Sequence, residues 1–486
     1  MVTNNQQRKY YLTTTLPYVN AAPHVGFALE IIQADVIARH KQAEGYDVFF
    51  NVGTDEHGKK VYEKALEAGQ DPQAYVDKWA AHFTPLKEAL SISWSNFIRT
   101  TDAHHQMAAQ EFWNRCVASG DIYKKMYKVK YCVGCELEKQ DSDLAHGKCP
   151  LHPNREIENI EEENYFFRFS EYGVRLLKLY EERPEMLVPA LRLRELQTFI
   201  ERGLEDFSIS RLKSKMPWGI VVPGDDAHVM FVWFDALVSY TSAIGWPDRM
   251  SEFEMWWPVV QFCGKDQGRQ QGAMWQAMLM SAKLPPSKQI VMHGFITSGG
   301  QKMSKSLGNV ISPFDLVREY GTDAVRYFLL REVTPFEDSD ITMERFKEAY
   351  NANLVNGLGN LVSRIMKMSE TYLPEETGNR KPETEVAPIP DSGLRIPELL
   401  EQYEFAKAMD VIWEEVASLD QKIQETKPFG VWKTDQEKAR AIVRELVSSL
   451  IGIAYKLQPF MPLTAEAIAQ AIKENKMPAP LFPRKE

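Results

Sequence analysis

Cysteine is scarce in this chain: five of its 486 residues are cysteines, and three of these fall between residues 132 and 149. A disulfide-stabilised scaffold would need more of them, so this usage indicates a reducing compartment. Long apolar runs are also missing, since none approaches the ~18 residues that a membrane-spanning helix needs. The first seven residues are polar, and no apolar signal segment follows them. We therefore expect a cytoplasmic protein that makes no membrane contact.

Positive charge is not in excess either, because the formal net charge is −10 at pH 7. Proteins that hold nucleic acid by bulk electrostatic attraction usually carry a basic surface. Any contact with RNA must therefore be local. The content of 44% hydrophobic and 26% charged residues is ordinary for a globular protein, and this length allows about two to four domains.

What the chain does contain is a lysine-rich sequence, Lys302-Met303-Ser304-Lys305-Ser306. It follows a strand-like run at 289–296 and a turn at Gly299-Gly300. A lysine ammonium is a compact donor that can follow charge onto a leaving group, so two lysines on a loop suit a polyphosphate. A solvated basic loop would have the same sequence, so this stretch does not decide the matter alone.

A second candidate phosphate site lies near the N-terminus. A strand-like run ends before Pro17, and an apolar periodic run begins at Pro23. Gly26 permits close backbone approach where the helix starts, the free amides there attract a phosphate, and the imidazole of His24 lies beside them. A histidine at a helix start is more often only a cap. Its combination with the distant lysine sequence favours the phosphate interpretation.

The hydrophobic pattern predicts an α/β domain of the Rossmann type, split by an insertion. We expect a helix at 26–42, a buried strand at 46–52 and further strands at 10–14, 259–263 and 289–296. His24 and Asp55 then follow the carboxyl ends of parallel strands, where open α/β sheets bind ligands. From about residue 119 to 229 the alternation of strands and helices stops, which indicates an inserted module.

Only helices are expected after about residue 340. Apolar residues recur there at spacings of four and three, as in the seams of a helix bundle: Leu354, Leu358, Leu361, Ile365 and Met368, then Phe405, Met409, Ile412, Val416 and Leu419. Ser312-Pro313 should start an earlier helix that Gly321 ends, and 371–391 should be a solvated loop. Four segments are therefore predicted. The two halves of the Rossmann domain are 1–118 and 230–340, the insertion between them is 119–229, and the all-α bundle is 341–486.

The inserted module contains a candidate metal site. Cys132 and Cys135 are separated by two residues, as are Cys149 and His152, and thirteen residues lie between the two pairs. Three cysteines and a histidine satisfy tetrahedral zinc and leave no position for substrate, so the site would be structural. A redox Cys-x-x-Cys, a disulfide and free thiols are the alternatives. The matched second pair favours one structural zinc.

These motifs resemble those of a known family. His24-Val25-Gly26-Phe27 and the lysine sequence resemble the HIGH and KMSKS motifs of class I aminoacyl-tRNA synthetases, and further segments in the same order resemble methionyl-tRNA synthetases. These segments are Leu16-Pro17-Tyr18, Gly53-Thr54-Asp55-Glu56-His57-Gly58, the zinc knuckle, Val232-Trp233-Phe234-Asp235-Ala236, Gly264-Lys265-Asp266 and His293-Gly294-Phe295. They span nearly the whole chain.

The resemblance implies ATP-dependent activation of methionine and its transfer to tRNA(Met), including the initiator tRNA. His24, Lys302 and Lys305 would be catalytic. ATP, with Mg2+, would contact His24, Gly26, Glu30, Asp266, Lys302, Ser304 and Lys305. Methionine would contact Leu16, Tyr18, Asp55, Trp233, Ala236 and Tyr240, with Arg211 supporting Asp55. Without the resemblance, Asp55 could be a turn residue, and Trp233 and Tyr240 could be core. Neither His57 nor His293 receives a chemical step.

The resemblance also implies an anticodon site on the bundle, formed by Asn360, Arg364 and Phe429. Asn360 and Arg364 are four apart on one helix, offset from the leucine seam, so we expect both to point outward. Phe429 stands where the family has tryptophan, and Trp432 is a possible substitute. A monomer is expected, since no appended dimerisation domain is evident.

Two departures from the family affect the ATP and methionine sites. Phe27 replaces the last histidine of HIGH and cannot hydrogen-bond ATP. Gln270-Gln271 replace a Phe-His pair and should make a more polar wall.

Three other functions fit parts of the sequence. Synthetases for Ile, Val, Leu or Cys share the ATP motifs, but segment 119–229 is too short for the large editing domain of the branched-chain enzymes. A simple nucleotidylyltransferase would not need a zinc module and a bundle. A non-catalytic tRNA-binding relative should lose the lysine sequence, which is intact here.

Overall fold

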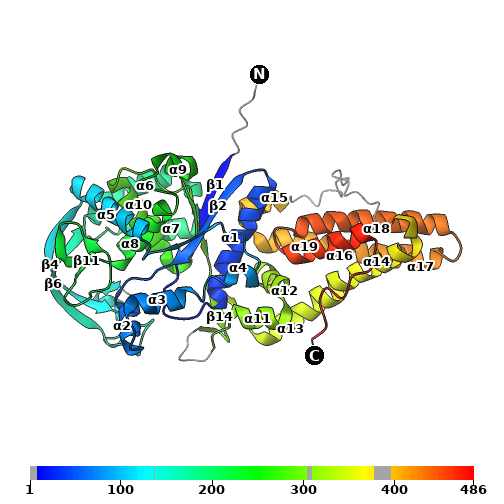
Figure 1. Cartoon of the computed structure of the whole chain (residues 1–486), viewed down its shortest axis with the longest axis horizontal. Helices are drawn as coiled ribbons and strands as arrows, with labels where there is room; N and C mark the ends of the chain where they lie inside the picture. The colour runs from blue at the N-terminus through cyan, green and yellow to red at the C-terminus, as the bar shows by residue number, and fades with distance from the viewer. Residues whose placement is uncertain (1–7, 136, 304–308, 377–395, 486) are drawn as a thin grey trace, which may run out of the picture. The chain divides into compact units, whose positions relative to one another are not determined.

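The computed structural model describes residues 8–135, 137–303, 309–376 and 396–485 (Figure 1). Contacts within the chain define two compact units. The first unit comprises 1–22, 46–85 and 94–293, and the second comprises 23–45, 86–93 and 294–486.

A six-stranded parallel sheet forms the centre of the first unit, in the order β3-β2-β1-β12-β13-β7. The strands are β1 (Lys9–Thr13), β2 (Asp47–Thr54), β3 (Asn96–Arg99), β7 (Leu187–Val188), β12 (Val260–Gly264) and β13 (Gln289–His293). Leu12 of β1 is fully buried and pairs with Phe50 on one side and Val260 on the other. Strands buried on both faces are typical of parallel sheets and explain the continuous apolar runs of the sequence. The Rossmann-type prediction is confirmed.

Two strand predictions need correction. The run 289–296 is two strands, because β13 ends at His293 and β14 (Ile296–Ser298) belongs to a separate sheet with β15 (Gln301–Lys302) and β16 (Ser339–Asp340). The chain turns at Gly294, where a Cβ would lie 2.0 Å from the carbonyl oxygen of Glu337, so only glycine fits. The two edge strands of the central sheet, β3 and β7, were not expected at all. They have only four and two residues, which give no detectable period.

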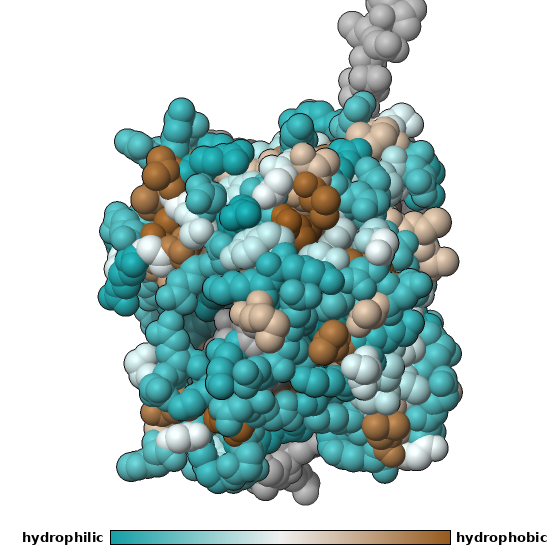
Figure 2. Space-filling model, turned by 90° about the vertical axis from the view of Figure 1, so that its left-hand side faces the viewer, coloured by the Kyte–Doolittle hydropathy of each residue, from teal (hydrophilic) through white to brown (hydrophobic). Residues whose placement is uncertain are grey.

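Two antiparallel sheets interrupt the alternation of strands and helices in the first unit. The larger has the order β5-β4-β6-β8, in which β4 (Ile122–Cys132) pairs with β6 (Glu158–Phe167) along nearly its whole length. The other strands are β5 (Leu137–Lys139) and β8 (Phe207–Ser208), and a smaller sheet contains β9 (Ser210–Leu212), β10 (Val221–Val222) and β11 (Asp225–Met230). On the side of the molecule that carries β4 and β6, hydrophobic residues form separate patches in a largely hydrophilic surface (Figure 2).

The helices of the first unit bury aromatic side chains. Phe112 and Trp113 of α5 contact Phe234 of α8 edge-on, with ring centroids 5.9 and 5.3 Å apart. The helices are α2 (Lys59–Glu67), α3 (Pro72–Ala80), α5 (Ala103–Ala118), α6 (Gly173–Glu182), α7 (Ala190–Glu201), α8 (Val232–Ser242), α9 (Met250–Trp256) and α10 (Trp275–Ser281). A π-helix, η5 (Gly268–Met274), precedes α10.

The second unit is mainly helical. It contains α1 (Val25–Ala43), α4 (Leu86–Ala89), α11 (Pro313–Tyr320), α12 (Thr322–Tyr327), α13 (Met343–Ala349), η8 (Tyr350–Gly359), α14 (Asn360–Tyr372), α15 (Ile396–Glu401), α16 (Phe405–Thr426), α17 (Pro428–Val431), α18 (Gln436–Leu457) and α19 (Pro462–Glu474). Both predicted apolar series are buried. The predicted ends of α11 are confirmed, because the Ser312 hydroxyl accepts from the Asp315 amide at 3.3 Å and Gly321 has φ 90°.

Beyond β16, the described residues contain no strand, as expected. Residues 371 and 372 end α14 instead of starting a loop, and 377–391 lie outside the described residues. No helix within the described ranges is both long enough and apolar enough to cross a bilayer.

Candidate functional site

The first unit brings three of the predicted methionine-binding residues together. Asp55 directly follows β2 and is buried. Its amide donates to the Pro17 carbonyl at 3.0 Å, and its carbonyl accepts from the Val19 amide at 3.3 Å. These two bonds hold the backbone of Leu16-Pro17-Tyr18 beside Asp55. A carboxylate next to backbone carbonyls is a suitable environment for an ammonium group.

Helix α8 supplies the other predicted methionine-binding residues. Trp233, Ala236 and Tyr240 recur at spacings of three and four, so they share one face of the helix. The Trp233 ring meets the half-buried Tyr18 ring edge-on, with centroids 6.5 Å apart. Ala236 and Tyr240 are buried. Aromatic rings around a small side chain suit an apolar ligand. The Tyr18 ring also joins this face of α8 to the segment that pairs with Asp55.

The Gln270-Gln271 departure has a structural consequence that the sequence did not reveal. The Gln271 amide donates to the Tyr240 hydroxyl at 2.7 Å and accepts from the Gln261 amide at 2.5 Å. Gln261 in turn accepts from the Ser287 hydroxyl. All four side chains are buried, so their polar groups bond to one another instead of to water. Gln271 is thus part of a chain of hydrogen-bonded buried amides that fixes the Tyr240 hydroxyl, whereas the buried Oε1 of Gln270 has no hydrogen-bond partner among the described residues.

Arg211 packs against two aromatic rings. Its guanidinium lies 4.3 Å from the Phe231 ring centroid and 5.1 Å from that of Tyr131, and it donates to the Ser210 carbonyl at 2.7 Å. A cavity of about 150 Å³ is bordered by Arg211, Phe231 and Tyr131, together with Gly58 and Lys59. Support of Asp55 by Arg211 stays a prediction.

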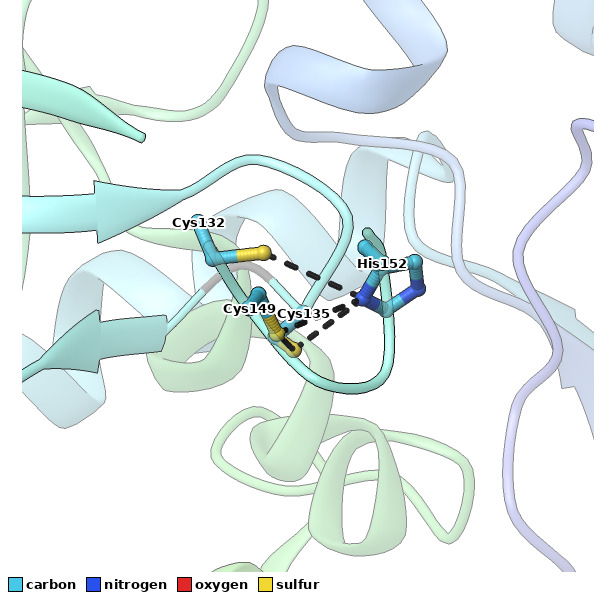
Figure 3. A group of neighbouring side chains, drawn as sticks. All are labelled: Cys132, Cys135, Cys149 and His152. Carbon is cyan, nitrogen blue, oxygen red and sulfur yellow. Dashed lines mark hydrogen bonds between the residues drawn. The ribbon is translucent and has the colours of Figure 1, made fainter. Parts of the chain in front are cut away.

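The four predicted metal ligands converge at the end of β4 (Figure 3). Their ligating atoms all lie within 4.8 Å of one another, and can hold one metal ion. The Cys135 sulfur is 3.4 Å from that of Cys149 and 3.2 Å from Nδ1 of His152. Sulfurs at that separation are not bonded as a disulfide, which needs about 2.05 Å. The spacing is close to the ~3.3–3.8 Å between ligands of tetrahedral zinc.

Gly134 is required for this approach, because a Cβ there would lie 2.4 Å from the His152 ring. The glycine inside the first Cys-x-x-Cys therefore makes room for the histidine. This spatial requirement was not visible in the cysteine spacing.

The second unit brings the two phosphate motifs together. His24 is the N-cap of α1, and its Nδ1 accepts from the Gly26 amide at 3.0 Å. A Cβ at Gly26 would lie 3.8 Å from the Met303 methyl carbon, and the Val25 amide donates to the Ile311 carbonyl at 3.0 Å. The cap interpretation is correct, and the start of α1 also lies against the lysine sequence.

The remaining ATP candidates are divided between the units. Glu30 is buried on α1, whereas Asp266 is exposed just after β12 in the first unit. Lys302 pairs through its backbone with Thr297. Ser304 and Lys305 lie outside the described residues.

Comparison with known proteins identifies the family. The family described as "tRNA synthetases class I (M)" matches residues 10–160 and 153–366. A methionine–tRNA ligase of Thermotoga maritima is 40% identical over 97% of this chain and 76% of its own, and one of Thermosynechococcus vestitus is 41% identical over 94% and 89%. The chain belongs to the methionine–tRNA ligase family.

A solved structure supports this assignment across both units. Mycobacterium tuberculosis methionyl-tRNA synthetase in complex with methionyl-adenylate superposes with a TM-score of 0.88 at 34% identity, covering 99% of each chain. The family consists of class I aminoacyl-tRNA synthetases, which are ligases.

The bundle contains the predicted anticodon residues of this family. Asn360 and Phe429 are exposed, Phe429 by 55%. Arg364 does not point freely into solvent as expected: it is half-buried and forms an ion pair with Asp420 of α16. Arg364, Lys367, Phe429 and Met477 border a cavity of about 360 Å³. The sequence could not show the ion pair, because the two partners are 56 positions apart.

Trp432 is not available as a free stacking surface. Its ring stacks on Tyr372 with centroids 4.1 Å apart and an interplanar angle of 7°. Of the two candidate aromatics, Phe429 therefore has the accessible ring.

Proposed function

We propose that this chain activates L-methionine with ATP and transfers it to the 3'-terminal adenosine of tRNA(Met), including initiator tRNA. The observation that carries the proposal is the backbone pairing of the segment Leu16-Pro17-Tyr18 with Asp55, together with the edge-on contact of Tyr18 with Trp233, in a chain of this family. This set pairs a carboxylate with aromatic surface, which suits an amino acid that has an ammonium group and an apolar side chain.

In the first step a methionine carboxylate oxygen attacks the α-phosphorus of ATP. The bond to the bridging oxygen of the β-phosphate breaks, and pyrophosphate leaves. Such phosphoryl chemistry depends on positioning and charge stabilisation and needs no protein nucleophile. In the second step a ribose hydroxyl of the terminal adenosine attacks the methionyl carbonyl, and AMP leaves.

The residues divide these tasks. Asp55 and the Leu16 carbonyl hold the ammonium, while Tyr18, Trp233, Ala236 and Tyr240 contact the thioether. Asp266 and Glu30 contact the nucleoside end of ATP. His24, the Gly26 amide, Lys302, Ser304 and Lys305 contact the phosphates, with the two lysines stabilising charge on departing pyrophosphate. The proximity of Gly26 to Met303 supports joint action of the two motifs. Mg2+ bound with ATP would neutralise phosphate charge.

Two further assignments belong to the proposal. Cys132, Cys135, Cys149 and His152 hold one structural zinc, since their chemistry and spacing leave no ligand position for substrate. Asn360, Arg364 and Phe429 read the anticodon on the domain 341–486. We further propose a cytoplasmic location, in line with the cysteine usage of the chain, and a monomeric state.

Amino-acid-dependent ATP/pyrophosphate exchange across all twenty amino acids tests the proposal. Methionine should support the fastest exchange, with weak activity for leucine or homocysteine, because an apolar site separates near-isosteres by only ~1–3 kcal/mol per methylene. Faster exchange with another amino acid would contradict the methionine assignment. Exchange without subsequent charging of tRNA(Met) would contradict the second step.

A further inference from the structure

A buried histidine–aspartate pair joins the two elements that carry the proposed methionine-binding residues. Nδ1 of His57 lies 3.0 Å from Oδ2 of Asp235, and the side chains are 4% and 0% exposed. His57 is two residues after Asp55, and Asp235 stands on α8 between Trp233 and Ala236. Neither residue of the pair has a role in the reaction as described above.

The partners of Asp235 differ from those of a carboxylate that only stabilises the fold. Its Oδ1 is buried and has no hydrogen-bond partner among the described residues. Burial raises the pKa of Asp235, and the adjacent His57 lowers it. A buried ion pair contributes little net stability unless its remaining atoms are satisfied. Among the described residues, the side chain of Asp235 therefore has His57 as its one hydrogen-bond partner.

The neighbouring Glu56 shows what a saturated structural carboxylate is like in the same loop. Its two oxygens accept from Arg99 at 2.7 and 2.8 Å, and from Thr54 and Thr101 at 2.7 and 2.5 Å. These contacts already fix the loop on the side of β3. What His57 adds is a link in the other direction, to α8.

We propose that His57 and Asp235 are positioning residues that fix the separation between Asp55 and the α8 residues, and thereby set the length of the side chain that is accepted. This inference rests on the proposed function. Discrimination per methylene reaches only about 10–200-fold even in a well-formed apolar site, so it depends on walls that do not shift. Misplacement by about 1 Å is enough to cost a factor of ~100.

A second buried histidine, which contacts the same helix α8 from α5, offers a matched control. Nδ1 of His105, on α5, lies 2.9 Å from the Ser242 hydroxyl at the last residue of α8. Burial lowers the pKa of His105 to about 3, so this contact is neutral. His105→Gln removes this contact with α8 and leaves the His57–Asp235 contact in place.

The experiment compares methionine with ethionine, which is one methylene longer, in ATP/pyrophosphate exchange by the full chain. We expect His57→Ala and Asp235→Ala each to lower the methionine-to-ethionine ratio of kcat/KM by about 10-fold, and the double variant to lower it no further, because either change removes the same link. Asp235→Asn keeps a hydrogen-bond acceptor and should retain most of the ratio. The KM for ATP should change little.

Three outcomes would overturn the inference. The first is an equal loss of kcat/KM for both amino acids in the alanine variants, and the second is a comparable fall of the ratio in His105→Gln. The third is failure of His57→Ala, Asp235→Ala and Asp235→Asn alike to fold, which would make the pair structural. Failure of the proposed function is distinguishable, since the unaltered protein would then not favour methionine at all.

Discussion

The candidate amino-acid residues in the first unit and the candidate phosphate and RNA residues in the second differ in their surroundings. In the first unit, Tyr240 is buried and held by Gln271, and Asp55 is buried between backbone partners. In the second, His24, Asn360 and Phe429 are exposed. The two sets face different recognition problems, because a thioether is distinguished by shape, whereas phosphates and bases are bound by charge and stacking.

Shape recognition requires fixed walls, and fixed walls require buried polar groups that are satisfied. Charge and stacking act across an accessible surface and tolerate side chains at helix ends and on loops. Loss of the groups that support each unit should therefore have the largest effects, and loss of single contacts at the surface should have the smallest.

Removal of the metal should have the largest effect, and it should fall on the first unit. Structural zinc contributes about 10–16 kcal/mol of apparent binding free energy in small modules, which is also folding free energy. Elemental analysis should give close to one zinc per chain. Cys149→Ser should lose this zinc and lower the thermal stability of the first unit. Cys263→Ser, at a buried cysteine of β12 outside the cluster, should keep the zinc. Full zinc content and unchanged stability in Cys149→Ser would refute the ligand set.

The second unit has a buried charge network that should be purely structural. Arg326 is fully buried, pairs with Asp35 of α1 at 2.8 Å and donates to the carbonyls of Phe460, Pro459 and Leu90 at 2.7, 2.9 and 3.1 Å. Unlike Asp235, it is well supplied with partners. Arg326→Met should lower the free energy of unfolding by roughly 3–5 kcal/mol, because it leaves these groups unpaired.

Urea unfolding of Arg326→Met provides the measurement. Lys407→Met removes an exposed ion pair with Glu404 in the same unit and should cost at most about 1 kcal/mol. Similar losses in the two variants would show that the buried network contributes no more than a surface contact.

The lysine sequence should act on the rate rather than on binding. Lys305→Ala should slow adenylate formation by roughly 100- to 1,000-fold, about 2.7–4 kcal/mol, if Lys305 stabilises charge that develops on pyrophosphate. Single-turnover rates and equilibrium methionine binding separate the two effects, with the exposed Lys178→Ala as control. Weaker methionine binding at an unchanged rate would assign the lysine to ground-state binding.

The sequence predicted local features well. The ends of α11, the buried seams of α14 and α16 and the convergence of the metal ligands depend on residues close together in the chain, or on strong chemical preference. It missed β3 and β7, which are too short for a period, and the break at Gly294, where the backbone of the distant Glu337 packs against the chain. The partners of Arg364, Asp235 and Tyr240 were also missed. Each is far away in sequence and is brought near only by the packing of helices.

The smallest effect is expected at the exposed face of the bundle. Arg364→Ala should impair charging of a tRNA with a CAU anticodon by ~1–3 kcal/mol, the scale of a lost base contact, and leave tRNA-free ATP/pyrophosphate exchange intact. The ion pair with Asp420 keeps Arg364 beside the accessible Phe429 ring at the border of the same cavity. A base that stacks on Phe429 would then lie within reach of the guanidinium.

Lys456→Ala is the matched control, because Lys456 also forms an interhelical ion pair in the bundle, with Glu415, but does not border that cavity. It should lose no charging activity. Equal loss in charging and exchange for Arg364→Ala would mean that the arginine supports the fold. No loss in either assay would remove Arg364 from the anticodon site, and the contrast between a buried amino-acid site and an exposed RNA site would then rest on Asn360 and Phe429 alone.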